Sequence, residues 1–261
     1  MTRTAVIMAG GRGERMARSG VDAPKPLVPI AGVTLLERNL RLLLRHGFDR
    51  ILVSVAAGDI EVRDAVATRL RPIGDQAGIA VDELVEEGPL GNIGAVRLLV
   101  GAVDPVLVVY ADNLTGIDLR QIYDDHVAGD ADLTLAAHLE PFVMPFGELA
   151  ADPDDPGLLA RYSEKPTYRP LVSSAVIVLG PRAVERAGVG GPIGISQLAQ
   201  ALVDDGRVVR LWLHDAPWVD VNDRAAIDRA ERLVAAHPDV FAVPDRIDGK
   251  DEIGSQPVVR S

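Results

Sequence analysis

The sequence contains no cysteine. This absence excludes disulfide bonds, thiolate catalysis and zinc sites built from cysteine. The sequence also lacks any run of eighteen uncharged apolar residues, so no membrane-spanning helix is predicted. The short apolar run at the N-terminus, which leads directly into glycines, is too short for a signal peptide. These absences predict a soluble, cytoplasmic protein.

Positive charge is also scarce, because the sequence has 27 basic residues and 38 acidic ones, which gives a net charge of −11. A general nucleic-acid interface would need a basic stripe, so nucleic-acid binding is not predicted. Only three of the basic residues are lysines: Lys25, Lys165 and Lys250. Lys25 lies in Pro-Lys-Pro and Lys165 in Glu-Lys-Pro. In a chain that otherwise uses arginine, these contexts suggest a need for a compact ammonium group; chance placement of surface lysines is the alternative.

The first half of the chain predicts alternating strands and helices. Strands are expected at residues 4–8, 51–56, 79–84 and 105–111, and helices at 33–45, 60–70, 91–100 and 119–127. Strands that are almost entirely apolar and separated by helices are typical of a mostly parallel sheet with both faces covered. The fold class predicted here is therefore α/β, Rossmann-like, within one large domain.

The second half predicts more strands, with proline and aspartate turns between them. They are expected at residues 133–138, 146–150, 159–163, 172–179 and 208–213. We interpret the first four as a smaller sheet that shares the first core, and residues 208–213 as a late strand. A closing helix over 223–236 has Asp223 as its N-cap. The predicted domain covers 1–236, with two halves at 1–130 and 131–236, and 237–261 is predicted to be a mobile tail.

A glycine-rich loop follows the first strand and contains Gly11, Gly13 and Arg15. Such a strand-to-helix loop is typical of phosphate binding, because free backbone amides and a helix N-terminus favour negative charge. The dinucleotide pattern fails, since Met16 stands in place of the third glycine, and no Gly-Lys-Ser/Thr follows to make a P-loop. The loop thus offers backbone amides, Arg15 and, ten residues later, Lys25. A tight turn with surface arginines is the alternative.

Taken in order, these motifs resemble the signature of the sugar-1-phosphate nucleotidyltransferases, which include mannose-1-phosphate guanylyltransferases and glucose-1-phosphate thymidylyltransferases. The signature begins with Gly-Gly-x-Gly-x-Arg, Pro-Lys-Pro and Leu-x-Pro-Ile-x-Gly, and it continues at residues 86–94, 107–113, 146–149, 162–166 and 218–221. The resemblance spans residues 1 to about 235. It implies a Mg²⁺-dependent enzyme that joins a nucleoside triphosphate to a sugar 1-phosphate and releases pyrophosphate.

The resemblance implies that residues 1–130 form a nucleotide-binding half and residues 131–236 a sugar-phosphate-binding half. It also implies roles for individual residues. Arg15 and Lys25 would face the phosphates, and Asp112 with Asp220 would hold Mg²⁺, for which carboxylates are suitable hard ligands. Nucleotide binding would involve Ala9, Gly10, Gly11, Gly13, Glu86 and Gly91. Sugar-phosphate binding would involve Gly147, Glu164, Lys165 and Ser173. As alternatives, Asp220 could be an ordinary turn residue, and Glu164 with Lys165 a surface ion pair.

The chain departs from the family pattern at three places. Residues 17–21 replace Pro-Leu-Thr, and Ala111 replaces the glycine before the metal aspartate. Ser173-Ser-Ala175 stands where the family has Asn-Ala-Gly, so the hydrogen-bonding reach is shorter and the backbone more crowded. Hexose, heptose and cyclitol phosphates are all compatible with this change.

Glu86 occupies the position that faces the base in the family. A carboxylate only accepts hydrogen bonds, and guanine offers it two adjacent donors, whereas the uracil edge would oppose it with carbonyl oxygens. This predicts GTP, followed by dTTP or UTP; Glu87 is the alternative if the loop shifts by one residue. Two other functions stay open: a non-catalytic relative that binds nucleotide sugars, and a transferase for a non-sugar phosphate. Oligomerisation is possible.

Overall fold

The structure, a computed structural model, describes residues 2–10 and 23–243. A seven-stranded sheet forms its centre, in the order β14-β8-β13-β6-β1-β4-β5. These strands are β1 (Thr4–Met8), β4 (Arg50–Ala56), β5 (Ala80–Glu86), β6 (Val106–Tyr110), β8 (Leu133–Leu139), β13 (Leu171–Leu179) and β14 (Val209–Leu213). Six strands run in one direction and β13 runs against them. The predicted mostly parallel α/β sheet is confirmed.

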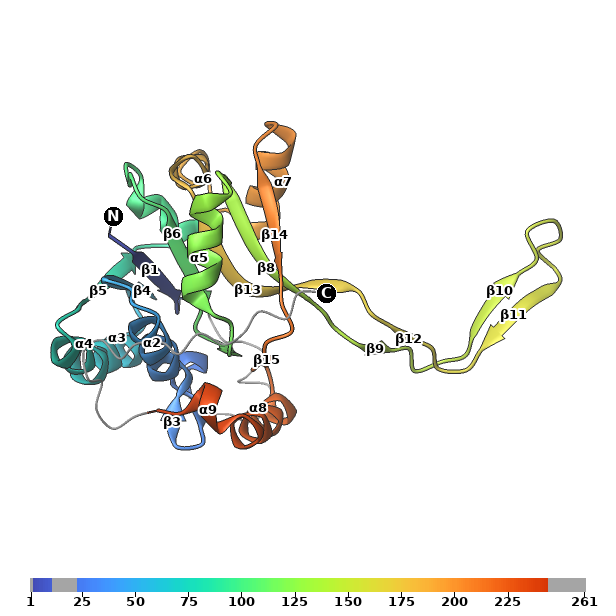
Figure 1. Ribbon diagram of the computed structural model, residues 1–261, viewed down its shortest axis with the longest axis horizontal. Coiled ribbons are helices and arrows are strands. Elements are labelled where there is room, and N and C mark those ends of the chain that lie inside the picture. Colours follow the sequence, from blue (N-terminus) through green and yellow to red (C-terminus); the bar gives the residue numbers. More distant parts are fainter. Residues whose placement is uncertain (1, 11–22, 244–261) are drawn as a thin grey trace.

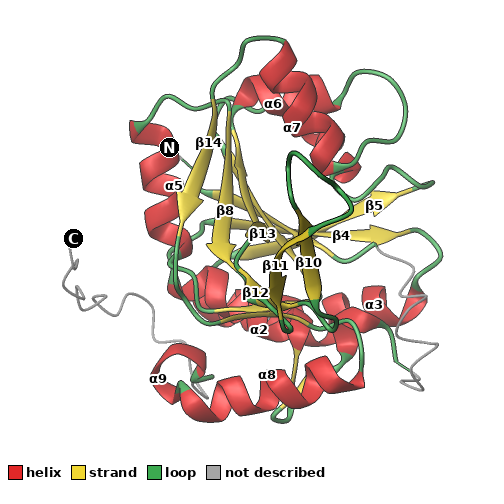
Figure 2. Ribbon diagram, turned by 90° about the vertical axis from the view of Figure 1, so that its right-hand side faces the viewer, coloured by secondary structure: helices red, strands yellow, loops and turns green. Residues whose placement is uncertain are grey.

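Helices cover both faces of this sheet (Figures 1 and 2). One face packs against α2 (Leu35–Arg45), α3 (Ile60–Ala65), the π-helical turn η2 (Val66–Leu70) and α5 (Leu119–Ala128). The other packs against the 3₁₀ segment η3 (Gly94–Leu99), α6 (Pro181–Ala187) and α7 (Ile195–Asp204). Among the described residues, no helix is long and apolar enough to cross a membrane. The two cores explain why strands β1 and β6 are apolar along their whole length.

Side-chain caps place several helix starts near the predicted positions. Thr34 caps α2, Asp118 caps α5 and Asp223 caps α8 (Arg224–Ala236) by accepting backbone N–H bonds. The helix predicted over 60–70 continues through η2 into α4 (Arg71–Ala77), because Gly78 provides the first left-handed residue, with φ of 70°. The helix predicted over 91–100 is only the short segment η3, and α6 and α7 were not predicted.

A third core closes the structure below the carboxyl edge of the sheet. It joins β2 (Pro29–Ile30), the start of α2, β7 (Asn113–Thr115), β15 (Trp218–Asp220), α8 and α9 (Pro238–Phe241), with η1 (Lys25–Leu27) and β3 (Val33–Thr34) next to β2 in the chain. Phe241 is buried in this core, and the Arg38 guanidinium donates to its carbonyl at 3.2 Å. The segment predicted to be mobile from residue 237 is therefore helical and packed at 238–241, and residues 244–261 lie outside the described residues.

The second half of the chain adds small two-stranded sheets, as the sequence predicts, while β8, β13 and β14 belong to the central sheet. Residues 140–170, called the arm, project away from the body as two successive ribbons (Figure 1). The ribbons are formed by β9 (Phe142–Val143) with β12 (Thr167–Tyr168), and β10 (Glu148–Ala151) with β11 (Leu159–Ser163). The arm projects because β8 and β13 stay paired as far as Leu139 and Leu171. The strands between them continue in the direction in which this pair leaves the body.

Candidate active site

The carboxyl ends of the parallel strands bring two groups of predicted residues to one edge of the sheet, where ligands bind in open α/β folds. The first group follows β1 and β5. Ala9 is buried, and its amide donates to the Ser54 carbonyl at 3.0 Å, which ties the end of β1 to β4. Gly10 comes next, at the start of the predicted phosphate loop.

Glu86 lies directly against Gly10. A Cβ atom on Gly10 would lie 2.6 Å from Glu86 Oε1, so the absence of a side chain is what allows this approach. The Ser54 hydroxyl donates to the same carboxylate oxygen, and Glu86 is buried. Glu87, in contrast, is exposed. Of the two glutamates that the sequence leaves open, Glu86 is the one that lies against Gly10.

The second group centres on Asp112, which follows β6. The Lys25 ammonium donates to Asp112 Oδ2 at 3.1 Å, and the Asn113 side-chain amide donates to Asp112 Oδ1 at 3.0 Å. Lys25 is held in η1, 87 residues earlier in the chain. Burial, and then the nearby Asp112 carboxylate, raise the pKa of Tyr110 above its usual value. A fixed positive charge and a carboxylate thus lie together at the edge of the sheet.

Asp220 reaches the same place from the far end of the chain. Strand β15 pairs with β7 so that Asp220 lies opposite Asn113, and the Val221 amide donates to the Asp112 carbonyl at 2.9 Å. Asn222 links the two acids, since its amide donates to Asp220 while its oxygen accepts from Lys25. The sequence analysis missed Asn222, although it stands only two residues after the predicted Asp220.

The donor set around Asp112 and Asp220 suits Mg²⁺. Mg²⁺ prefers oxygen ligands and is usually bound through one or two carboxylates together with substrate phosphates and water. Asp112 and Asp220 supply two carboxylates, and the Asn113 side-chain oxygen is buried without a partner among the described residues. No group of three or more metal-ligating side chains occurs in residues 2–10 and 23–243, so the remaining ligands would have to come from elsewhere.

Gly91 has a clear structural reason to be glycine. Its φ is 87°, and any side chain would collide with the backbone of Ile193. The Ile193 amide donates to the Leu90 carbonyl at 2.8 Å, so the loop before η3 is joined to the segment before α7. The predicted nucleotide contact of Gly91 stays a prediction.

The predicted sugar-phosphate residues Gly147, Glu164 and Lys165 all lie on the arm rather than at the edge of the sheet. Gly147 packs against the Tyr162 ring, and the Tyr162 hydroxyl donates to Glu164 Oε2 at 3.1 Å. Lys165 is exposed and has a φ of 45°, an uncommon conformation for a residue other than glycine. Figure 1 shows this arm leading away from the sheet, so the structure does not place these residues beside Asp112.

At the root of the arm, Ser174 rather than the predicted Ser173 has the buried hydroxyl. The Ser174 hydroxyl lies 2.7 Å from His138 Nδ1 and 2.6 Å from His214 Nε2. Burial, and then the neighbouring His138, lower the pKa of His214 to about 4. Ser173 is exposed. Ala175 takes a φ of 56°, which favours glycine, the residue that the family has at this place.

Trp218 completes this group of side chains. Its indole N–H donates to the Ser174 carbonyl at 2.8 Å, and its ring lies 4.8 Å from that of His138. His138 and His214, which both contact Ser174, are 76 residues apart in the sequence, so no local spacing could have predicted that they lie together. Trp218 therefore packs at the root of the arm, two residues before Asp220.

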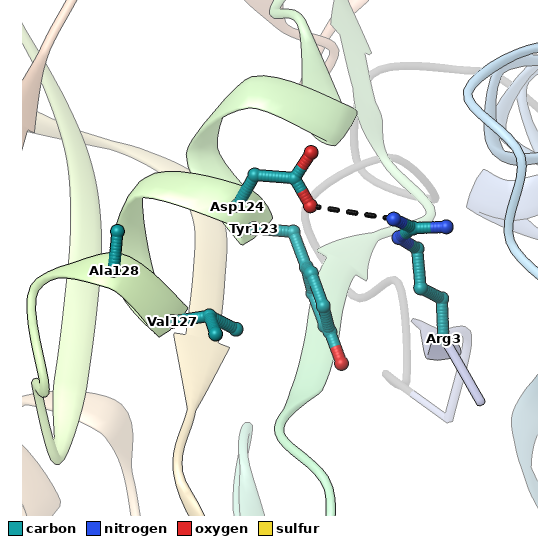
Figure 3. Close-up of a pocket in the computed structure, with 5 residues that line it drawn as sticks. All are labelled: Arg3, Tyr123, Asp124, Val127 and Ala128. Atoms are coloured by element: carbon teal, nitrogen blue, oxygen red, sulfur yellow. Dashed lines mark ion pairs between the residues drawn. The ribbon is translucent and has the colours of Figure 1, made fainter. Parts of the chain in front are cut away.

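Gly11, Gly13 and Arg15 lie outside the described residues. A separate pocket of about 250 Å³ is lined by Arg3, Tyr123, Asp124, Val127 and Ala128 (Figure 3). Arg3 precedes β1, and an ion pair of 3.5 Å joins it to Asp124. This pocket lies at the amino end of the strands and contains none of the predicted site residues.

With this geometry established, comparison with known families decides the classification. The family model of the MobA-like NTP transferase domain matches residues 5–176. The chain belongs to this family. The match covers β1, Lys25, Glu86 and Asp112, and it ends within β13. It supports the resemblance to sugar-1-phosphate nucleotidyltransferases, as do the names of the curated relatives.

One such relative is mannose-1-phosphate guanylyltransferase of Mycobacterium tuberculosis, 27% identical over 207 residues, which are 77% of this chain and 56% of the relative. Another is D-glycero-alpha-D-manno-heptose 1-phosphate guanylyltransferase of Aneurinibacillus thermoaerophilus, 28% identical over 51% of this chain and 56% of the relative. The chain thus spans about half the length of the curated relatives it matches. Adenylyl- and uridylyltransferases also match.

Solved structures confirm the fold. HddC from Yersinia pseudotuberculosis has a TM-score of 0.66 at 22% identity, over 88% of this chain and 99% of that chain. A putative glucose-1-phosphate thymidylyltransferase from Bacillus anthracis has a TM-score of 0.69 at 16% identity, over 96% of this chain and 98% of that chain. At these identities the likeness concerns the fold alone.

Proposed function

We propose that this protein is a nucleotidyltransferase that joins a nucleoside triphosphate, preferably GTP, to a sugar or sugar-like 1-phosphate. The observation that carries the proposal is the convergence of Lys25, Asp112 and Asp220 at the carboxyl edge of the sheet, next to the start of the glycine loop. The family membership and the names of the relatives support the same reaction class.

In the proposed reaction, a phosphate oxygen of the sugar 1-phosphate attacks the α-phosphorus of the triphosphate. The bond from this phosphorus to the bridging oxygen breaks, and pyrophosphate leaves with the electron pair. Negative charge accumulates around the α-phosphorus, so positioning and charge neutralisation dominate catalysis. The Lys25 ammonium is the described group that supplies positive charge here, and Arg15 is proposed to contact the phosphates that depart.

Asp112 and Asp220 would hold Mg²⁺, which, when bound, neutralises phosphate charge and orients the phosphate oxygens. In the structure, Asp112 pairs with Lys25, and Asn222 connects Lys25 to Asp220. Lys25 offsets only one of the two carboxylates, so this group of side chains keeps one negative charge, which favours a cation. Asp112 is 30% exposed, so its carboxylate is accessible to a ligand that approaches the edge.

The preference for GTP is proposed from the position of Glu86. Its carboxylate lies beside Gly10, and one of its oxygens already accepts from Ser54. Each carboxylate oxygen has a second lone pair, so Glu86 can still accept the two adjacent N–H donors of guanine. Uracil and thymine would place carbonyl oxygens against the same carboxylate, which is a repulsive contact.

One panel of substrates tests both the proposed reaction and the preference for GTP. Pyrophosphate release is measured for the common triphosphates, each combined with hexose, heptose, cyclitol and choline phosphates. GTP should give the highest kcat/KM in the wild type. Glu86→Gln should shift the preference toward UTP or dTTP, because an amide can both donate and accept. Glu87→Gln is the matched control and should leave the preference unchanged. A tenfold preference of the wild type for dTTP or ATP would contradict the role of Glu86, and turnover of none of these phosphates would contradict the reaction.

A further inference from the structure

The arm and its root display much of the exposed apolar surface of the molecule. Of the twenty large hydrophobic side chains that are exposed in the described residues, ten lie within residues 139–171: Leu139, Phe142, Val143, Phe146, Leu149, Leu158, Leu159, Tyr162, Tyr168 and Leu171. The whole chain has only four phenylalanines and four tyrosines, and half of each type lies in this group. Aromatic residues are typical of protein interfaces.

Strand register separates the outer ribbon of the arm into two different faces. Leu149 lies opposite Tyr162, and Ala151, two residues later and so on the same face, lies opposite Leu159 across a β-bulge that brings Leu159 to this face. The opposite face carries Glu148 and Arg161, whose charged groups are 3.6 Å apart. One face is thus apolar and the other polar. Leu149, Leu159 and Tyr162 are each about 60% exposed, so no other described residue covers the apolar face.

A two-stranded ribbon with an uncovered apolar face is marginally stable in water. Ten such side chains, each with roughly 100 Å² exposed, offer on the order of 1,000 Å². A stable protein–protein interface needs about 800 Å² from each partner. The exposed surface on the arm and its root is therefore large enough for a specific partner.

The body provides a matching stripe beside the root of the arm. Leu211 and Leu213 lie on the edge strand β14 and are 56% and 66% exposed. The pairing of β14 with β8 and of β8 with β13 aligns them with Leu139 and Leu171 on one face of the sheet. We call these four residues the edge stripe. The chain thus carries both a projecting apolar ribbon and an apolar surface on the body.

We propose that two copies of this chain pair through these surfaces, with the apolar face of each arm lying on the edge stripe of the other copy. A two-fold arrangement uses the same two surfaces twice and leaves neither exposed. It also covers the open edge of β14, which would otherwise be available for unwanted strand pairing. The arm is not suited to an anionic membrane, because Asp152, Asp154 and Asp155 at its tip would be repelled.

Sedimentation analysis of the full chain at micromolar concentration tests the pairing. The wild type should sediment as a dimer. Leu149→Asp places a charge on the apolar face of the ribbon and should raise the dimer dissociation constant about 30-fold or more. Val103→Asp is the matched control, since Val103 is 85% exposed on the body, and it should stay dimeric. Circular dichroism melting of each variant verifies that the body is folded.

Cross-linking tests which surfaces meet, and the absence of cysteine makes it specific. Equal amounts of Leu149→Cys and Leu213→Cys proteins are mixed and treated with a short bismaleimide. A product of twice the chain mass that requires both variants supports the proposal. A monomeric wild type, an unchanged dimer in Leu149→Asp, or a link that forms only within the Leu149→Cys/Leu213→Cys double variant would overturn it. Binding of the wild type to phosphatidylglycerol vesicles, in place of dimerisation, would also overturn it.

Discussion

At the scale of single residues, the proposed catalytic group depends on one carboxylate with two partners. Asp112 accepts from the Lys25 ammonium through Oδ2 and from the Asn113 amide through Oδ1. Both partners are hydrogen-bond donors, so each oxygen of the carboxylate accepts one bond at the edge of the sheet. Carboxylate oxygens at this edge are suitable ligands for a cation, either free or bound to a substrate phosphate.

Replacement of Asp112 by asparagine should reduce kcat by about 10²–10³, because the shape is kept while the negative charge is lost. Asp64→Asn, which changes an exposed acid on α3, is the control and should keep full activity. Steady-state pyrophosphate release at saturating Mg²⁺ measures both. Activity of Asp112→Asn within a few-fold of wild type would show that the carboxylate has no catalytic charge role.

Lys165 permits a second test at this scale. If Lys165 contacts the sugar phosphate, Lys165→Ala should weaken binding of the acceptor about tenfold or more, since a hydrogen bond to a charged group is lost. Triphosphate binding should be nearly unchanged, whereas Arg15→Ala should affect the triphosphate and kcat. Arg169→Ala is the control on the same arm. Isothermal titration with each ligand measures the effect, and equal losses for both ligands would refute the separate roles.

At the scale of elements, the last described helix secures the third core. Arg38 on α2 is buried and donates to the Ile30 and Phe241 carbonyls, and burial lowers the pKa of its guanidinium. Arg45, at the end of α2, donates to the Val240 carbonyl at 2.7 Å. The helix α9 thus joins α2 to α8 next to the strand that carries Asp220.

Phe241→Ala should lower the free energy of unfolding by about 3 kcal/mol, because a buried aromatic ring is removed and a cavity is left. Asp239→Ala, an exposed change in the same helix, should have an effect below about 0.5 kcal/mol. Urea denaturation followed by circular dichroism measures both. If Phe241→Ala had no effect on the midpoint, α9 would not be part of the stable fold.

At the scale of the whole molecule, two histidines with lowered pKa values, His126 and His214, predict how stability depends on pH. Burial lowers the pKa of His126 to about 4 from its ordinary 6.5, and it also lowers that of His214 to about 4. Between these values the unfolded chain binds protons that the folded protein does not bind. Stability should therefore be complete above about pH 6.5 and should decrease as the pH falls toward 4.

His126→Gln should reduce this dependence, because one of the two groups is removed. His126 Nδ1 lies 2.8 Å from the Thr134 hydroxyl, a contact that a glutamine amide can partly replace. The variant should lose about 5 °C less in Tm than the wild type between pH 7 and pH 4.5. Differential scanning calorimetry across this range measures the difference, and His237→Gln, which changes an exposed histidine, is the control. Parallel curves for all three proteins would contradict the assignment.

The sequence alone was sufficient for a covered, mostly parallel sheet and for the position of Glu86 and Asp112 at the ends of its strands. Apolar strands between helices determine a covered parallel sheet, and the carboxyl ends of such strands must meet at one edge. Glu86 and Asp112 each stand at such an end, so their placement follows from local pattern. Asp220 reaches the same edge, as its motif predicts, although its partner Asn222 was missed.

Only the tertiary structure decided what depends on distant contacts or on strand direction. The pleat of β5 places Glu86 against Gly10 and leaves Glu87 exposed, and the Ser174 contacts join histidines from β8 and from the end of β14. Apolar and polar side chains alternate along residues 140–170 as in any half-buried ribbon. This pattern predicts strands, but it does not predict which part of the molecule covers them. Whether such strands fold back on the body or project from it depends on the direction in which β8 and β13 leave the sheet, and local sequence periodicity does not encode that direction.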